Sequence, residues 1–545
     1  MHDIIRKLAL QNAVKYGGKV NAGAVIGRLF AEHPEKKGQE IIKLVNQVCN
    51  EINKIPFEKQ KEELDKYGVV EEVKKKSDVF VLPELKNPKK KVIVRFAPNP
   101  NGPLHFGHAR QAVLNWLFKE KYKGEFILRF DDTDPKVKPP LKEAYEWIKK
   151  DLKWLGIKPD KIVIQSKRLV TYYKYAKELI TLGKAYVCRC ETEQKRKLLI
   201  KGLSCACREE SAERQVLEWN KFLNKYKEGH AVVRIKTDLN EKNPAVRDWP
   251  ALRIIDHPKH ALIKNKRIWP LLNFASAIDD MEFGVTHIIR GIDLKVSSER
   301  QEYIFKNYSL DYPETIYTGK LNFDGVKSTS EAAELIRTKK ISGWDDIQLG
   351  TLMALRRRGI LAETIVNFMK DAGLNKNEIN VSVEKIAAFN RQLLDKKANR
   401  YFFVEDPKKI TIKNAPAMRV TVPLHPEYKR RGGKIFNTKG DFYINDKLIN
   451  NKVYRLMHLF NFKNKIFVSE EHDPSLHAQL IHWLPANDKN VKVEVLMPNG
   501  KKVEGLGEKS LTNLKEGIVV QFYRFGFCRL DKKEKNKLLF WYSHG

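Results

Sequence analysis

The sequence predicts an α/β protein whose core is a doubly wound parallel sheet, preceded by helices and followed by antiparallel β-structure. Two apolar strands, VIVRF at residues 92–96 and FILRF at residues 126–130, flank a helical pattern at residues 105–121. A strand, a helix and a second strand in this order form a parallel βαβ unit. The pattern stops at a cysteine-bearing segment, residues 186–266, and resumes with the strand-like THIIRG. This order predicts a domain inserted within the sheet.

The chain divides into segments of different character. At roughly 100–200 residues per domain, the 545 residues suffice for about three to five domains. Apolar residues recur at helical spacing early in the chain, and short alternating runs separated by turn signals follow residue 401. We expect a helical N-terminal appendage (1–88), a parallel-sheet domain in two halves (89–185 and 267–341), an insertion (186–266), a helical linker (342–400) and antiparallel β-barrels (401–545).

The charge balance indicates a polyanionic partner. The chain has 102 Lys and Arg against 67 Asp and Glu, a formal net charge of +35. An excess of this size favours phosphate contacts and hence nucleic acid; a lysine-rich, heat-adapted surface is the alternative. No run approaches the ~18 apolar residues of a membrane span, so we expect no membrane partner. The N-terminus lacks a secretory signal, which predicts a cytoplasmic protein with reduced thiols.

The segment RFAPNPNGPLHFGHAR, at residues 95–110, places His105 and His108 three residues apart where the predicted helix begins. Side chains at this spacing share one face of a helix. Unpaired N–H groups and the positive dipole end at a helix N-terminus bind phosphate, and Gly102 and Gly107 let backbone approach a ligand. We interpret the segment as a triphosphate site; a helix start with incidental histidines is the alternative.

Six segments in order carry a resemblance to a known family: RFAPNPNGPLHFGHAR, RFDDTDP, NPAVRDWPALRI, THIIRG, SGWDD and NRYFFVEDP. The chain resembles the class I aminoacyl-tRNA synthetases, and within them the archaeal-type glutamyl-tRNA synthetases of the glutamyl/glutaminyl subgroup. HFGH is similar to the HIGH motif of that family. The resemblance implies a Rossmann-type catalytic domain, an insertion that binds the tRNA acceptor stem, and C-terminal barrels that bind the anticodon.

The resemblance implies that ATP and L-glutamate form glutamyl-adenylate and pyrophosphate, after which glutamate is joined to the 3′ end of tRNA and AMP is released. His105, His108 and Lys327 are the implied catalytic residues, and magnesium would carry part of the pyrophosphate charge. The implied ATP contacts are Pro98, Asn101, Gly102, His105, Gly107, His108, Ser328 and Thr329.

For glutamate, the resemblance implies that Arg95 binds a carboxylate and that Asp131 binds the ammonium group. Arg290 matches an arginine that glutamyl enzymes carry where glutaminyl relatives have an uncharged residue. A guanidinium favours a γ-carboxylate over an amide. The implied glutamate contacts are Arg95, Ala97, Asp131, Leu272, Ser276 and Arg290.

The sequence departs from the family in two places. The usual Pro-x-Tyr is Pro-Leu-Leu at residues 270–272, so we expect Ser276 or Asn273 to supply the polar contact to glutamate. The KMSKS motif is reduced to GVKSTSEAAELI, in which Lys327 is the nearest cation and Glu331 adds a negative charge. Either Lys327 reaches the pyrophosphate, or helix N–H groups and magnesium suffice.

Four of the six cysteines form a C-x-C-x14-C-x-C pattern: Cys188, Cys190, Cys205 and Cys207. Four thiolates suit a closed tetrahedral zinc site that stabilises the insertion and leaves no position open for catalysis. Four reduced thiols without a metal are the alternative.

The resemblance also implies the macromolecular partner and the rival functions. We expect glutamate tRNA as the partner, and also glutamine tRNA if the chain is non-discriminating like many archaeal relatives. We do not expect a DNA partner. We expect the basic residues Arg356, Arg357 and Arg358 to contact tRNA, and the chain to be a monomer. A glutaminyl-tRNA synthetase is disfavoured by Arg290 and Ala97. A non-catalytic tRNA-binding paralogue has only the reduced KMSKS segment in its favour, and a tRNA-modifying glutamyl transferase would lack the barrels.

Overall fold

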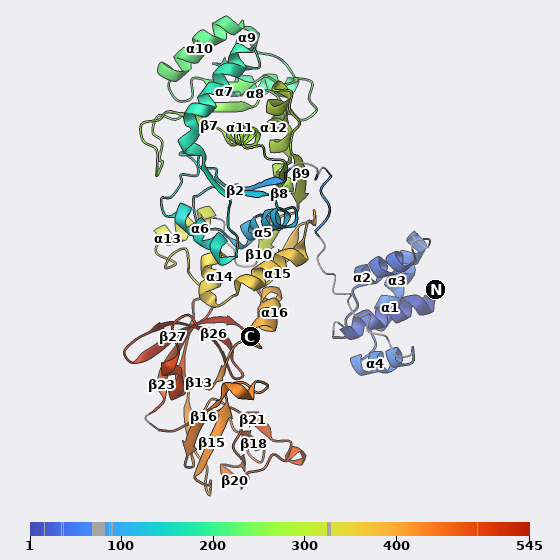
Figure 1. Ribbon diagram of the computed structural model, residues 1–545. Coiled ribbons are helices and arrows are strands. Elements are labelled where there is room, and N and C mark those ends of the chain that lie inside the picture. Colours follow the sequence, from blue (N-terminus) through green and yellow to red (C-terminus); the bar gives the residue numbers. More distant parts are fainter. Residues whose placement is uncertain are drawn as a thin grey trace. The chain divides into compact units, whose positions relative to one another are not determined.

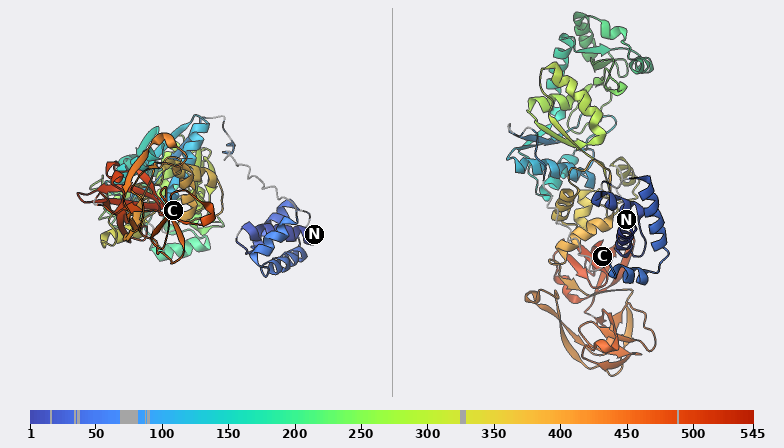
Figure 2. Two further views of the ribbon diagram at one scale, coloured as in Figure 1. Left: turned by 90° about the horizontal axis from the view of Figure 1, so that it is seen from below. Right: turned by 90° about the vertical axis from the view of Figure 1, so that its right-hand side faces the viewer.

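The computed structural model describes residues 1–15, 17–33, 35, 38–67, 82–86, 88, 91–323, 329–487 and 489–545, and the chain forms two compact units, Met1–Val81 and Leu82–Gly545. The first unit consists of α1 (His2–Lys15), α2 (Ala22–Glu32), α3 (Gln39–Ile52) and α4 (Phe57–Asp65), seen from two further sides in Figure 2. Its core is apolar, with Ile5, Val45 and Ile52 fully buried.

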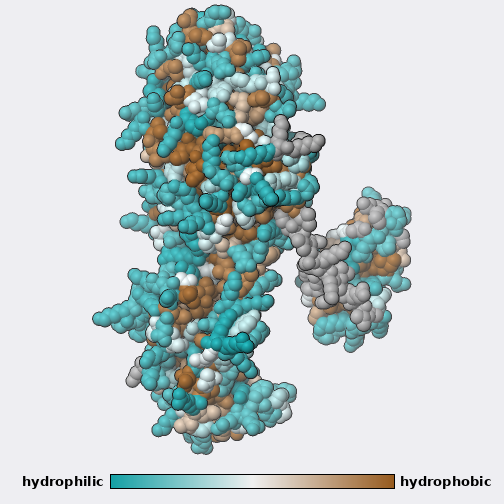
Figure 3. All heavy atoms as spheres, in the orientation of Figure 1, coloured by the Kyte–Doolittle hydropathy of each residue, from teal (hydrophilic) through white to brown (hydrophobic). Residues whose placement is uncertain are grey.

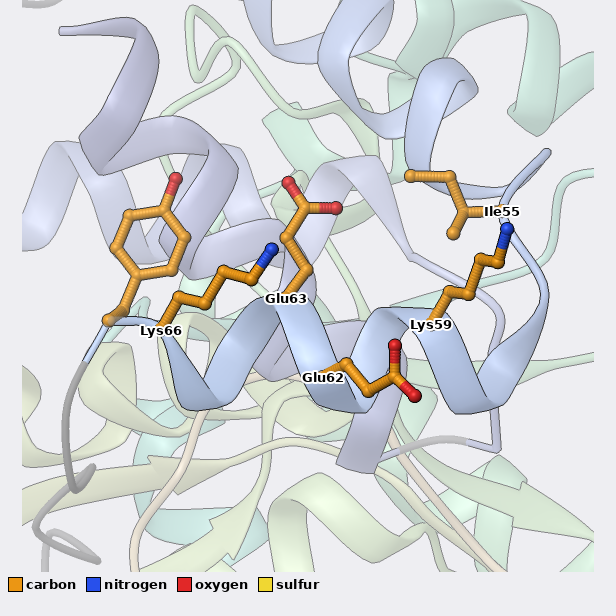
Figure 4. A pocket seen from close by; sticks show the side chains of 6 residues that line it. Ile55, Lys59, Glu62, Glu63 and Lys66 are labelled. Atoms are coloured by element: carbon orange, nitrogen blue, oxygen red, sulfur yellow. The ribbon is translucent and has the colours of Figure 1, made fainter.

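A hollow beside α4 in the first unit is lined by side chains of both charges (Figure 4): Ile55, Lys59, Glu62, Glu63, Lys66 and Tyr67. Glu63 forms an ion pair with Arg6 of α1 at 2.6 Å, so its carboxylate already has a partner within the first unit.

A five-stranded parallel sheet forms the centre of the second unit (Figure 1). The strand order is β3-β2-β1-β8-β9, as in a Rossmann half-sheet extended on one side. The strands are β1 (Ile93–Phe96), β2 (Glu125–Phe130), β3 (Lys161–Ile164), β8 (His287–Gly291) and β9 (Glu314–Thr318). Helix α5 (Phe106–Lys121) packs on β1, β2 and β8. The predicted βαβ unit and parallel sheet are therefore confirmed.

Between β3 and β8 in the chain, four strands form a separate antiparallel sheet. It consists of β4 (Ala185–Cys188), β5 (Val232–Ile235), β6 (Pro250–Ile254) and β7 (Ile268–Pro270), with α8 (Thr192–Lys201), α9 (Ala206–Glu209), α10 (Ala212–Asn224) and the short helix η3 (Pro244–Val246) between its strands. The buried tryptophans Trp219, Trp249 and Trp269 join it to the helices of the parallel-sheet domain in one apolar core. The helices that contribute to this core are α7 (Leu169–Thr181), α11 (Leu272–Glu282) and α12 (Lys295–Asn307). The same region of the chain also contains α6 (Ala144–Trp154), η2 (Gln165–Arg168) and η4 (Ile292–Leu294).

Helices follow the parallel sheet. They are α13 (Thr329–Arg337), α14 (Leu352–Arg358), α15 (Ala362–Ala372) and α16 (Val383–Leu394), with the parallel pair β10 (Leu321–Phe323) and β11 (Ile379–Val381) among them. Helix α15 packs on α5, so this helical region supports the helix that begins at His105.

The C-terminal region is built of antiparallel and mixed sheets. The largest has seven strands in the order β12-β25-β26-β27-β23-β24-β13, and its two outer strands are adjacent in the chain, β12 (Arg400–Tyr401) and β13 (Phe403–Glu405). The other elements are β14 (Lys408–Thr411), β15 (Met418–Pro423), η5 (Lys429–Arg431), β16 (Gly433–Thr438), β17 (Asp441–Ile444), β18 (Val453–Leu456), β19 (Asn461–Lys463), β20 (Ile466–Ser469), η6 (Pro474–Leu476), β21 (Gln479–Ile481), β22 (Leu484–Pro485), β23 (Val491–Leu496), β24 (Lys502–Gly507), η7 (Lys509–Asn513), β25 (Val519–Phe522), β26 (Gly526–Lys533) and β27 (Lys537–His544). Closed barrels, like the segment boundaries, stay predictions.

Hydrophilic residues, drawn in teal, cover most of the face of the second unit seen in Figure 3. Among the described residues, no helix combines the length and the apolar character needed to cross a bilayer.

Candidate active site and cysteine cluster

A cavity of about 660 Å³ opens at the carboxyl ends of β1, β2 and β8. Parallel sheets bind ligands at this edge because the loops there diverge to opposite faces. The cavity brings together most of the residues expected to bind ATP and glutamate: Arg95, Ala97, Pro98, His105, Gly107, His108, Asp131, Leu272 and Arg290.

The two histidines at one end of the cavity form a stacked pair, with ring centroids 3.7 Å apart. His105 is the N-cap of α5, and its Nδ1 accepts a hydrogen bond from the backbone N–H of Gly107 at 3.1 Å. His108 Nδ1 accepts in turn from the backbone N–H of His105 at 3.3 Å. The imidazoles thus take the roles that Ser and Glu usually share in a capping box. Since each Nδ1 is an acceptor, each neutral ring carries its proton on Nε2.

Both histidines are neutral at physiological pH. Burial lowers the pKa of His105 to about 4. Burial, followed by the charges of His105 and Lys138, lowers the pKa of His108 well below its usual value. The pair therefore offers two neutral Nε2–H donors beside the N-terminus of α5, which together suit a polyphosphate.

The His105 ring approaches Gly107 so closely that any side chain at position 107 would have to shift the ring slightly. A Cβ at Gly107 would lie 3.0 Å from Cε1 and 3.1 Å from Nδ1 of His105. The backbone on either side is also held, because Leu352 N–H donates to Leu104 O at 2.8 Å and Phe106 N–H donates to Gly350 O at 3.0 Å. The phosphate end of the cavity is therefore supported by the start of α14.

The other end of the cavity contains an array of buried ion pairs. Arg95 Nε and Nη2 donate to the two oxygens of Asp280 at 3.0 and 3.1 Å. Asp280 also accepts from Arg129 Nη1 at 2.6 Å, and Arg129 Nε donates to Asp131 at 2.7 Å. Charges alternate from Arg95 through Asp280 and Arg129 to Asp131, so the array orients both Arg95 and Asp131, which line the cavity.

The pKa values reflect this pairing. Burial alone would lower the pKa of Arg129, but the charges of Asp131, Asp280 and Asp279 hold it well above its usual range. Burial would raise the pKa of Asp280, but Arg95 and Arg129 lower it. Arg290 differs, because burial and next the charge of Arg95 lower its pKa. Arg129 and Asp280 therefore stabilise each other's charged forms, whereas no such partner raises the pKa of Arg290 above its usual value.

Several predicted site residues lie behind the cavity or at its edge. Ser276 is buried and its Oγ contacts Arg129 Nη2 at 2.9 Å and Asp131 at 3.3 Å, so it supports Asp131. Leu272, the first residue of α11, lines the cavity, and Asn273 has a buried Oδ1 without a partner among the described residues. Asn101 does not line the cavity.

Four cysteines of the insertion form a second candidate site. The Sγ atoms of Cys188, Cys190, Cys205 and Cys207 all lie within 4.8 Å of one another. Burial, and next the charges of Cys205 and Cys207, raise the pKa of Cys190 to about 11. Donors surround the sulfurs: Lys195 Nζ is 3.3 Å from Cys205 Sγ, and the backbone N–H of Arg189 is 3.4 Å from Cys207 Sγ.

Protein-family models match nearly all of the second unit. Residues 91–396, more than half of the chain, match the catalytic domain of the tRNA synthetases class I (E and Q). The chain belongs to this family. Residues 398–481 and 480–531 match two anticodon-binding domains of the same class I synthetases.

Curated proteins similar to this class I synthetase include a glutamate–tRNA ligase of Pyrococcus furiosus, 46% identical over 99% of this chain and 98% of the relative. A glutamate–tRNA ligase of Methanocaldococcus jannaschii is 43% identical over 100% of both chains. Among solved structures, a glutamate tRNA ligase from Elizabethkingia meningosepticum in complex with its amino acid matches 57% of this chain and 71% of its own, at 21% identity and a TM-score of 0.40. A likeness at that level supports no further inference.

The reduced KMSKS segment of this synthetase is described only in part. Lys327 and Ser328 lie outside the described residues, and their expected roles stay predictions. Thr329 begins α13, and its Cγ2 would lie 2.8 Å from a Cβ at Gly102. Trp344 of the SGWDD segment would lie 3.2 Å from the same Cβ. Gly102 therefore allows α13 and Trp344 to pack against the loop that precedes His105.

The three arginines expected to contact tRNA make contacts within the synthetase. Arg357 pairs with Asp531 of β26 and with Asp345, at 2.8 and 2.9 Å. Arg358 is buried and donates to Ser543 O at 3.2 Å. The Arg356 guanidinium lies 5.8 Å from the Trp154 ring centroid. Their contact with tRNA stays a prediction, and Arg357 joins the catalytic region to the C-terminal sheet.

Sequence reasoning missed the residues that hold the array together. Arg129 and Asp131 are two positions apart, and this spacing on a strand places them on one side, which was a usable signal. Asp280 could not be assigned in this way, because Asp279 beside it is equally acidic and equally buried. Asp279 instead accepts from Gln165, Arg168 and Tyr172.

Proposed function

We propose that this class I synthetase is a glutamate–tRNA ligase. It activates L-glutamate with ATP to glutamyl-adenylate and pyrophosphate, then transfers glutamate to the 3′ end of tRNA and releases AMP. The observation that supports this most directly is the shared cavity, which has an imidazole pair at one end and Arg95, Asp131 and Arg290 at the other. A nucleotide and an acidic amino acid can meet there.

In this mechanism the phosphate end of the cavity binds and aligns ATP. His105 and His108 donate from Nε2 to phosphate oxygens, together with the N–H groups at the start of α5. The α-carboxylate of glutamate attacks the α-phosphorus, so the protein supplies alignment and stabilising donors and no nucleophile. Magnesium, when bound with ATP, supplies positive charge to the pyrophosphate.

The amino-acid end binds the three charged groups of glutamate. Asp131 accepts from the ammonium group, and Arg95 donates to a carboxylate. Arg290 donates to the γ-carboxylate. A charged hydrogen bond of this kind contributes roughly 1.5–3 kcal/mol, or about tenfold to a hundredfold against an uncharged amide. This favours glutamate over glutamine, and so disfavours a glutaminyl enzyme.

We include a structural zinc ion in the proposal. Four convergent sulfurs, from the end of β4, the loop after it and the start of α9, make a closed donor set that fits Zn²⁺, and nearby N–H donors can stabilise its thiolates. Cys188, Cys190, Cys205 and Cys207 would hold the ion and thereby stabilise the insertion, which we propose binds the acceptor end of tRNA.

The C-terminal β-region is proposed to bind the anticodon of glutamate tRNA and, in a non-discriminating enzyme, of glutamine tRNA. Single-stranded loops are read by stacking and by contacts to base edges. We further propose that Arg356 and Arg357, which are partly exposed, lie along the RNA, and that the enzyme acts in the cytoplasm as a monomer. Arg358 was expected to contact tRNA as well, but it is buried and donates to Ser543 O, so it supports the C-terminal sheet instead.

Aminoacylation of purified glutamate and glutamine tRNAs, each offered with either amino acid and ATP, tests the proposed function. Glutamate should be joined to glutamate tRNA, and its attachment to glutamine tRNA would define a non-discriminating enzyme. Charging with glutamine alone would reverse the substrate assignment. No ATP consumption with either amino acid would favour a non-catalytic tRNA-binding protein.

A further inference from the structure

Among the described residues, Arg290 is hydrogen-bonded by neutral side chains only. Its Nη1 donates to Ser298 Oγ at 3.1 Å and to Gln301 Oε1 at 2.9 Å. Both partners are on α12, three positions apart and hence on one face of the helix. Arg290 is 5% exposed, and its Nε has no partner among the described residues. Within the described part of the chain, no carboxylate forms an ion pair with Arg290.

Arg290 differs in this respect from the other two buried arginines at the amino-acid end of the cavity. Arg95 forms an ion pair with Asp280, and Arg129 forms ion pairs with Asp131 and Asp280. The γ-carboxylate of L-glutamate would give the Arg290 guanidinium an ion-pair partner, whereas the uncharged γ-amide of L-glutamine would leave this buried charge without one.

Gln301 is the position at which a carboxylate would give Arg290 an ion-pair partner within the protein itself. It is fully buried, and its Oε1 also accepts from the Tyr312 hydroxyl at 2.7 Å. Two donors thus orient Oε1 toward Arg290. Glutamate has the same shape as glutamine, and at position 301 it would form an internal ion pair with Arg290.

We propose that Gln301, together with Ser298, is a specificity-determining positioning residue: by holding Arg290 through neutral oxygens it keeps the guanidinium charge available for the γ-carboxylate of the substrate. The inference rests on the proposed function. It concerns the choice between a γ-carboxylate and a γ-amide, and it assigns Gln301 no contact with the reacting atoms.

Gln301→Glu tests the inference, with Gln301→Leu as the control that removes the hydrogen bond without adding charge. ATP–pyrophosphate exchange is measured in the presence of tRNA, giving kcat and KM for glutamate and the inhibition constant of glutamine as a competitor. Gln301→Glu should raise the glutamate KM by about tenfold or more, because the charged contact of Arg290 with substrate is weakened. The ratio of the glutamine inhibition constant to the glutamate KM should fall by a similar factor.

Gln301→Leu should affect the two amino acids alike and leave this ratio within about threefold of the original. An unchanged ratio in a folded Gln301→Glu protein would overturn the inference, as would an equal shift in Gln301→Leu. If Gln301→Glu does not fold, Ser298→Asp places the carboxylate at the other partner of Arg290, with Ser298→Ala as its control, and the same ratio decides. Absence of glutamate-dependent exchange in the unaltered enzyme would instead contradict the proposed function.

Discussion

The two ends of the active-site cavity differ in the kind of side chain that would bind a charged ligand. The phosphate end uses neutral donors, the imidazoles of His105 and His108, which are three residues apart and held by the backbone of α5. The amino-acid end uses full charges from separate elements, with Asp280 of α11 between Arg95 of β1 and Arg129 of β2.

The difference follows from the ligands. A polyphosphate brings several charges and, with magnesium, its own counter-charge, so neutral oriented donors are sufficient. A zwitterionic amino acid brings charges at fixed separations, and opposite charges must be held at matching positions. Buried charges of this kind are stable only when paired, which explains the continuous array.

His108→Ala should have the largest effect on activity. It removes one Nε2–H donor from the phosphate end and one acceptor from the cap of α5. Loss of a preorganised donor typically lowers kcat by about 10²–10³-fold. ATP–pyrophosphate exchange measures this, and tRNA affinity should be nearly unchanged. His108→Asn, which keeps a cap acceptor and a donor, should recover part of the loss, and exchange near the original rate in His108→Ala would remove the imidazole from the mechanism.

Asp280→Asn should disrupt the amino-acid end and leave the phosphate end intact. Arg95 and Arg129 would both lose their shared carboxylate. Breaking a buried pair costs about 3–5 kcal/mol of stability, and kcat/KM for glutamate should fall by about tenfold to a hundredfold while KM for ATP changes little.

Asp279→Asn is the matched control for Asp280→Asn, because Asp279 is equally buried but pairs most closely with Arg168, at 2.8 Å, and lies 3.8 Å from Arg129. Urea unfolding should show a comparable loss of stability in both proteins. A comparable loss of kcat/KM for glutamate in both would contradict the special role of Asp280.

Cys190→Ser should show whether the cysteine cluster and the cavity serve different steps of the reaction. Loss of one of four thiolates should reduce bound zinc below about one ion per chain, measured by metal analysis. Aminoacylation of tRNA should then fall by more than ATP–pyrophosphate exchange, because the cavity does not include the cysteines. Equal zinc content in the two proteins would contradict the metal site.

The smallest expected effect is a pH dependence of stability at the phosphate end. The folded pKa of His105 is about 4, below the value of 6.5 expected without burial. As the pH falls from about 6.5 toward 4 the unfolded chain binds the proton first, so the free energy of unfolding should decrease, by at most about 1.4 kcal/mol per pH unit. His105→Asn should weaken this slope in urea unfolding between pH 4 and 8. An identical slope in both proteins would show that His105 does not titrate in this way.

The phosphate end could be predicted from the sequence because its interactions are local. His105, Gly107 and His108 are within one helical turn, so their spacing and the helix start already determine which atoms meet. The cysteine pattern was likewise sufficient to predict a cluster, since two short C-x-C turns can converge without knowledge of the fold.

The amino-acid end was decided by the tertiary structure. Arg95 and Asp280 are 185 positions apart, and Arg129 and Asp280 are 151 apart, so no local spacing indicates which of the two adjacent aspartates joins the arginines. The sequence alone determined the parallel βαβ unit and the placement of two imidazoles at the start of a helix, whereas the lowered pKa of both histidines follows from their burial in the fold. Only the fold decided how the buried charges are paired, because it brings Asp280 of α11 to Arg95 and Arg129 and brings Gln301 of α12 to Arg290.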